Sequence, residues 1–144
     1  MFADLLRRMT APAPDRMPDA DARLALGALL VRLARADGHY DPVEKDRIEA
    51  ILARRYDLTD ARELRLQCEA LEAEAPDTVR FTRAIKDAVD YDHRLGVIAA
   101  MWQIVLADGE RDAQEDSIMR MVAPMLGVTD QDSNAARRRI EAQG

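Results

Sequence analysis

The sequence predicts an all-α protein, and three observations support this fold class. From about residue 19 onward, apolar residues recur every three or four positions, the spacing of a helix with one buried face. The alternation of β-branched and polar residues that is typical of strands never extends over a useful length. A short acidic motif also occurs twice, 71 residues apart. We therefore expect about seven helices in a single compact, bundle-like domain, which suits a chain of 144 residues.

The first 18 residues differ from the rest of the chain. Residues 2–9 predict a short amphipathic helix, and residues 10–18, which contain three prolines, predict an extended connector. The apolar stretch at the start is too short for a secretion signal. No run of about 18 apolar residues that could span a membrane occurs in the sequence. We expect a cytoplasmic protein.

Six apolar stripes predict the helices that follow. Their members, in chain order, are Leu26, Leu29, Leu30, Leu33 and Ala34; Ile48, Ile51 and Leu52; Leu64, Cys68 and Leu71; Phe81, Ile85 and Val89; Val97, Ile98, Met101, Trp102, Ile104 and Val105; and Ile118, Met121, Val122 and Met125. The periodic methionines are expected to fill gaps in the core. The last segment, residues 130–143, is poor in apolar residues, so we expect it to fray.

The chain is predicted to contain an internal repeat. The stretch Asp19 to Leu24 resembles Asp90 to Leu95, and Asp57 to Asp60 resembles Gly127 to Asp130. Fixed-period similarity of this kind is the signature of a duplicated structural unit. We divide the chain into a leader, 1–18, and a helical domain, 19–144. Within that domain, residues 19–60 form repeat one and residues 90–130 form repeat two.

The repeated motif has the form A-D-G-x-x-D-x-x-E and begins at Ala36 and again at Ala107. One interpretation is purely structural. Gly38 suits the left-handed conformation that often follows a helix. Asp41 suits the N-cap of the next helix, and Glu44 stands where a capping box places its acidic residue. The second copy offers the same roles to Gly109, Asp112 and Glu115.

The other interpretation is a metal site. Asp37 and Asp108 have no role in the structural interpretation, because a carboxylate at the end of a helix faces the negative end of its dipole. A bound cation would offset this. Carboxylates are the hard oxygen ligands that Ca²⁺, Mg²⁺ and Mn²⁺ prefer. We therefore expect Ca²⁺ or Mg²⁺, in a site other than an EF-hand, with the candidate ligands Asp37, Asp41, Glu44, Asp108, Asp112 and Glu115.

Acidic pairs at 19/21 and 90/92 mark the predicted starts of the two long apolar helices, where they suit N-caps. A helix from Asp21 to Asp37 rises about 24 Å, so the two acidic ends of one repeat cannot meet. If the two long helices pack antiparallel, however, the pair at 90/92 approaches the Asp37 turn. That arrangement would create two related acidic sites.

Composition excludes several classes of function. The net charge of −6 argues against generic nucleic-acid binding, and Arg137 to Arg139 are expected to form a solvated helical face. Cys68 is a single cysteine at a core position, so we expect a buried, inert thiol. Two histidines are too few for the usual zinc site. No nucleophile motif or phosphate-binding loop is present, and we expect neither catalysis nor a small-molecule substrate.

At these motifs the sequence resembles the TerB family, tellurite-resistance protein B and its relatives. Members have a repeated helical fold, two helices that end in A-D-G-x-x-D-x-x-E, and a stretch like Leu126 to Asp130 after the second. The resemblance covers about residues 19–132. It implies a small cytoplasmic protein associated with resistance to tellurium oxyanions and other stresses. It also implies acidic residues that bind a divalent metal, and a protein partner at the inner membrane surface.

Two functions follow from these observations. The first is a metal-binding module of a stress or tellurite-resistance response. The second is a plain helical protein–protein interaction domain whose acidic motifs serve only as helix caps. The sequence leaves the identity of the ion and of the partner open.

Overall fold

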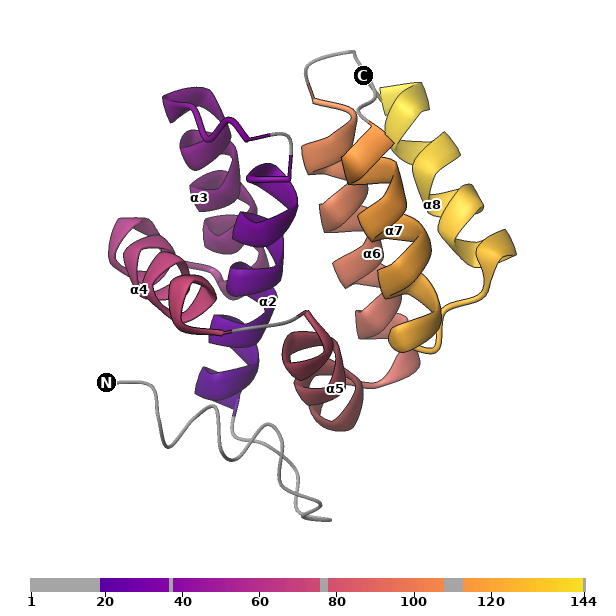
Figure 1. Ribbon diagram of the computed structural model, residues 1–144, viewed down its shortest axis with the longest axis horizontal. Coiled ribbons are helices and arrows are strands. Elements are labelled where there is room, and N and C mark those ends of the chain that lie inside the picture. Colours follow the sequence, from indigo (N-terminus) through magenta and orange to yellow (C-terminus); the bar gives the residue numbers. More distant parts are fainter. Residues whose placement is uncertain (1–18, 37, 76–77, 108–112, 144) are drawn as a thin grey trace.

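The structure is a computed structural model that describes residues 19–36, 38–75, 78–107 and 113–143. The predicted helix at 2–9 lies outside the described residues. Within them the all-α prediction is confirmed, with seven helices in one domain (Figure 1). These helices are α2 (Asp19–Ala34), α3 (Pro42–Tyr56), α4 (Arg62–Glu74), α5 (Val79–Ala88), α6 (Tyr91–Val105), α7 (Ala113–Met125) and α8 (Asp130–Gln143).

Helix α2 lies at the centre of the fold and contacts α3, α4, α5, α6 and α7. Its sequence explains this position, because residues 24–31 are Leu, Ala, Gly and Val only, and a helix that is apolar on every side must be covered on every side. Its inner residues are fully buried. Helix α6 is similarly apolar and packs against α2, α3, α7 and α8.

Helices α3 and α7 end in the same way. Asp57 and Gly127, which follow them, both have left-handed backbone conformations, with φ of 55° and 72°. In both places the next residue's N–H reaches back to a carbonyl of the helix, over 2.9 Å from Leu58 to Ala53 and over 2.9 Å from Val128 to Ala123. This bond is characteristic of a Schellman cap. The equivalence agrees with the proposed internal repeat, which stays a prediction.

The expectation that residues 130–143 fray is wrong. They form the regular helix α8, which packs against α6. The indole N–H of Trp102 donates to Ser133 Oγ at 3.1 Å, and the buried Ala136 lies on the same side of the helix. Small residues let α8 approach Trp102 closely, so a helix with few large apolar residues is nevertheless held in place.

The predicted core is confirmed at most positions and is wrong at one methionine. Five predicted members are only partly buried: Ile51, Leu64, Val89, Ile118 and Met125. Met101 is fully buried, but Met121 is 40 % exposed and points out of the core. Met119, two residues earlier, is buried in its place. The apolar pattern of α7 is compatible with two rotations of the helix about its axis, one that buries Met121 and one that buries Met119. The fold adopts the second, which also buries Val122 and Leu126. Among the described helices, none is both long and apolar enough to cross a membrane.

Cys68 and Gly27 form the closest contact between α2 and α4. Cys68 is fully buried, as predicted, and a Cβ added to Gly27 would overlap its sulfur atom. Glycine at position 27 therefore lets α4 lie directly against the backbone of α2. The thiol is held in apolar surroundings, and burial raises its pKa to about 12, with a smaller contribution from the charge of Glu69.

Replacing Gly27 with alanine should destabilise the protein by about 1–3 kcal/mol, because the added methyl group must displace a packed helix. Gly96→Ala is the matched control, since a Cβ there meets only the flexible end of Arg55 and alanine favours the helix. Urea unfolding of both variants measures the difference. Adding Cys68→Ala to Gly27→Ala should recover part of the loss, and a Gly27→Ala protein as stable as the wild type would contradict the close packing.

Alkaline pH should destabilise the protein through Cys68. An unfolded thiol ionises near pH 8.5, whereas the buried thiol keeps its proton to about pH 12. The folded state therefore holds more protons, and the free energy of unfolding falls as the pH rises from about 9 toward 12. In urea titrations over this pH range, the free energy of unfolding of the wild type should fall by up to about 1.4 kcal/mol per pH unit relative to that of Cys68→Ala. Identical slopes for the two proteins would show that the thiol is not buried.

Candidate functional site

The first acidic corner joins α2 to α3. Gly38 has φ of +84°, and its N–H donates to Arg35 O at 3.0 Å, so the glycine takes the predicted left-handed position after the helix. Asp41 is the N-cap residue of α3, as predicted, with extended backbone, and Pro42 stands in the first turn, where its missing N–H costs no hydrogen bond. The corner prediction is confirmed for the backbone.

The carboxylate of Asp41 does not take its predicted role. The side chain is exposed and makes no capping hydrogen bond within the described part of the molecule. The amides of Glu44 and Lys45 donate instead to the main-chain oxygen of Asp41, at 3.0 and 3.1 Å. Because the backbone already uses the amide that a capping box would offer, the carboxylate of Asp41 faces solvent.

The start of α6 shows the contrasting case. Asp90 is the N-cap of this helix, and its carboxylate accepts a bond from the amide of His93 at 3.0 Å. The same oxygen lies 2.6 Å from His93 Nδ1. Capping by the acidic residue that precedes the helix is therefore confirmed at Asp90 and absent at Asp41.

The candidate metal ligands are described only in part. Asp41 and Glu44 lie in the first turn of α3 or beside it, and Glu44 is half-buried. Asp37, Asp108 and Asp112 lie outside the described residues, and Glu115 belongs to α7 with its side chain outside them too. Within the described residues, no three His, Cys, Asp or Glu side chains gather into a metal-binding cluster. The six-ligand hypothesis stays a prediction.

The two related acidic sites required the two long helices to pack antiparallel, and the structure does not meet this condition. Asp90 and His93, at the start of α6, line the same hollow as Ala22 and Arg23, at the start of α2. The two helices therefore begin on one side of the molecule and end on the other, as Figure 1 shows. Three helices, and therefore four connections, separate α2 from α6 along the chain. The pair at 90/92 thus lies far from the first corner.

Parallel packing has a consequence for the acidic motifs. The last turns of α2 and α6, and the first turns of α3 and α7, all lie on the upper side in Figure 1. The helix ends that flank the two copies of the motif therefore lie on the same side of the bundle. The sequence comparison alone paired each corner with the wrong end of the other long helix.

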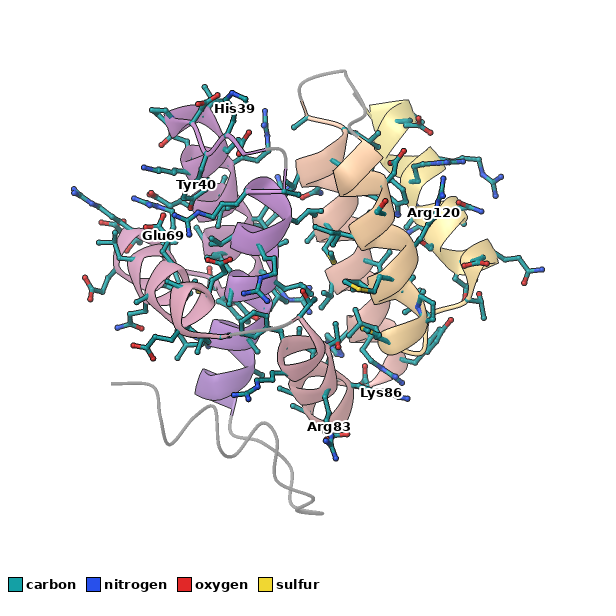
Figure 2. All side chains as sticks on the ribbon, viewed as in Figure 1. His39, Tyr40, Glu69, Arg83, Lys86 and Arg120 are labelled. Carbon is teal, nitrogen blue, oxygen red and sulfur yellow. The ribbon has the colours of Figure 1, made fainter. Side chains whose placement is uncertain are left out.

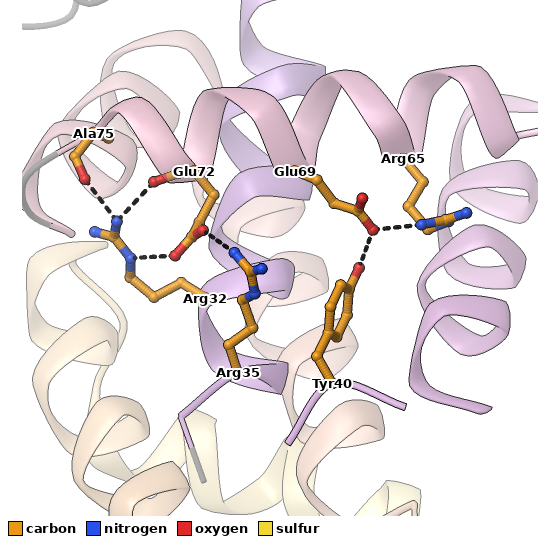
Figure 3. A network of polar contacts seen from close by, with 7 residues as sticks. All are labelled: Arg32, Arg35, Tyr40, Arg65, Glu69, Glu72 and Ala75. Carbon is orange, nitrogen blue, oxygen red and sulfur yellow. Dashed lines mark hydrogen bonds and ion pairs between the residues drawn. The ribbon is translucent and has the colours of Figure 1, made fainter. Parts of the chain in front are cut away.

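Tyr40 fixes the first corner to α4. Its hydroxyl donates to Glu69 Oε2 at 2.6 Å, and the buried Arg65 forms an ion pair with the same carboxylate. Arg65 also pairs with Glu49 at 2.6 Å. Burial raises the pKa of Tyr40, and the neighbouring carboxylate of Glu69 raises it further, so the phenol remains a donor. Figure 3 shows this chain of contacts, and Figure 2 shows Tyr40 and Glu69 on neighbouring elements.

A second set of contacts joins the end of α2 to the end of α4 (Figure 3). Arg32 donates to the main-chain oxygens of Ala75 at 2.8 Å and Glu72 at 3.1 Å, which are carbonyls at the end of a helix. The carboxylate of Glu72 accepts from Arg32 at 3.3 Å and from Arg35 at 2.9 Å. Arg35 also lies over the Tyr40 ring, 5.3 Å from its centre.

Sequence reasoning missed this network, although a signal was present. Arg32 and Arg35 are three residues apart, as are Glu69 and Glu72, so each pair lies on one face of its helix. Helical spacing shows that two such faces exist but not that they meet. His39, next to Tyr40, is exposed, as Figure 2 shows.

Comparison with known families supports the resemblance. The family described as tellurite resistance protein TerB matches residues 23–138, most of the helical domain. The chain belongs to the TerB family. Neither the curated proteins nor the solved structures gave a significant match. The matched region of this TerB-family protein runs from the first turns of α2 into α8 and so includes both acidic corners.

Replacing Tyr40 with phenylalanine should remove one hydrogen bond to a charged group. We expect the free energy of unfolding to fall by about 1.5–3 kcal/mol, less if water replaces the phenol at this half-buried site. A double-mutant cycle with Glu69→Gln, measured by urea unfolding, separates this contact from the pairing of Glu69 with Arg65. Strictly additive effects of the two substitutions would contradict the contact.

Proposed function

We propose that this TerB-family protein is a module that binds a divalent cation at its acidic corners and acts in a stress or tellurite-resistance response. The observation that carries the proposal is the carboxylate of Asp41. It occupies a cap position, yet it is exposed and takes no part in the cap. A helix corner can be built without such a charge, so an exposed carboxylate beside the turn is available as a ligand for a hard cation.

The surroundings of the corner support this role. The Tyr40 contact with Glu69 holds the residue next to the turn, so binding an ion would order little additional chain. The nearby charge of Arg35 is offset by Glu72. Lys45 lies over the Tyr40 ring, 5.2 Å from its centre. Its positive charge would repel a metal ion bound at the corner.

The proposal extends to the second corner. The helix ends that flank the two corners lie on the same side of the bundle. We expect the six acidic residues to present one acidic surface there, with one or two ion sites. Ca²⁺ or Mg²⁺ would bind there in a structural or sensing role, without catalysis. The proposed partner is a protein at the inner membrane surface. This TerB-family protein would bind it from the cytoplasm, and the charge of its own surface would change when the ion binds.

One observation favours the alternative function, a plain interaction domain. Val43 is 63 % exposed and follows Asp41 and Pro42 directly. An exposed β-branched residue at the tip of an acidic corner suits a protein contact. In this alternative the acidic residues give the interface its charge, and no ion is needed.

Metal titration of chelator-treated protein by calorimetry separates the two functions. An ion that binds only the folded state should raise the free energy of unfolding by about 2.7 kcal/mol at 100 times its dissociation constant. We expect this with Ca²⁺ or Mg²⁺, and with Mn²⁺ as a further hard cation. Asp41→Asn should weaken binding at least tenfold, an effect of about 1.4 kcal/mol.

Asp87→Asn provides the matched control, because this exposed carboxylate on α5 carries the same charge away from the corner. It should leave metal binding unchanged. The absence of any heat and any stabilisation with all three ions would reject the metal-binding function and leave the interaction domain. Equal weakening by the two substitutions would show a general charge effect in place of a site.

A further inference from the structure

A hollow of about 430 Å³ lies at the opposite end of α2 from the first acidic corner. It is bounded by the start of α2, the end of α3 and the connection from α5 to α6. Its volume falls in the range of small-molecule sites. The described residues that line it are Ala22, Arg23, Arg55, Tyr56, Ala88, Val89, Asp90 and His93.

Two arginines and a tyrosine give the hollow its chemistry. The guanidinium carbon of Arg23 lies 4.6 Å from the centre of the Tyr56 ring, and that of Arg55 lies 5.9 Å from it. Both cations therefore lie against the same aromatic ring, and all three residues line the hollow. Burial raises the pKa of Tyr56, although the neighbouring arginines oppose this, so its hydroxyl keeps a proton that it can donate.

Among the described lining residues, cationic side chains outnumber carboxylates. Neither Arg23 nor Arg55 forms an ion pair with a carboxylate of the described chain, and Arg55 donates to the main-chain oxygen of His93 at 3.2 Å. Asp90 is the single carboxylate among the described lining residues, and His93 Nδ1 lies 2.6 Å from it. The protein as a whole carries a net charge of −6, so this excess of cations is local.

We propose that this hollow binds a small anion through an oxyanion head group, a phosphate or a chemically similar group. Guanidinium groups offer paired N–H donors whose geometry matches such a head group. No described residue accepts a hydrogen bond from Arg23, which is the principal contact, and Arg55 retains the donors that His93 does not use. The apolar side chains of Ala22, Ala88 and Val89 form a wall for an organic body.

The proposed anion site does not depend on the main-chain amides at the start of α6. Asp90 already accepts from the amide of His93, so the helix end is capped by the chain itself. The site rests on two guanidinium groups that share an aromatic ring beside a hollow. It is independent of the proposed metal site, because it lies at the other end of α2 and its ligand has the opposite charge.

Calorimetry in metal-free buffer with inorganic phosphate and with AMP tests the proposal. The two probes share a head group, and the tighter one shows whether the source is an inorganic ion or an organic phosphate. Arg23→Gln should weaken binding at least tenfold. Arg54→Gln is the matched control, because the neighbouring arginine is exposed and does not line the hollow, and it should have no effect.

Amide chemical shifts recorded with the same probes locate the bound anion. We expect changes at residues 22–23, 55–56 and 88–93, with Arg55→Lys keeping weaker binding because it preserves the charge. Thermal unfolding of each variant checks that it is folded. Binding of neither probe, equal loss in Arg23→Gln and Arg54→Gln, or shifts confined to Arg137 to Arg139 would each overturn the proposal.

Discussion

Burial of α2 on all sides is the constraint on which the rest of the structure depends. Five other helices contact it, and Gly27 allows one of them, α4, to approach its backbone. A helix covered in this way can carry polar groups only at its ends. Its charged residues are Asp19, Asp21 and Arg23 at one end and Arg32 in the last turn, and Arg35 follows directly after the helix. The chemistry of the molecule is therefore confined to two places by the packing of its centre.

Arginine side chains also donate hydrogen bonds to main-chain carbonyl groups at the ends of neighbouring helices. Arg32 donates to Glu72 and Ala75 at the end of α4, and Arg94 donates to Leu126 O, just after α7, at 2.7 Å. An unpaired buried carbonyl costs free energy comparable to a lost hydrogen bond. Long cationic side chains reach these groups from a neighbouring helix, so the same contacts satisfy the helix ends and lock pairs of helices together.

The sequence predicted what depends on local pattern and failed where distant segments meet. Helical spacing located the buried residues of α2 and α6, and the glycine of the first corner took its predicted conformation. The direction of α6 relative to α2 could not be predicted in this way, because it depends on three intervening helices. The arrangement of Tyr40 with Glu69 was missed for the same reason, and so was the contact that keeps α8 in place.

The two proposed sites are best understood as opposite ends of one rigid element. Helix α2 has 16 residues, which corresponds to about 24 Å, whereas charges in physiological salt are screened beyond about 8 Å. A cation at the acidic corner and an anion in the hollow would therefore not sense each other through the field between them. Any coupling has to pass through movement of α2, and five packed neighbours oppose that movement. Occupancy of one end should thus be independent of occupancy of the other, which suits a module that joins two partners without transmitting a signal between them.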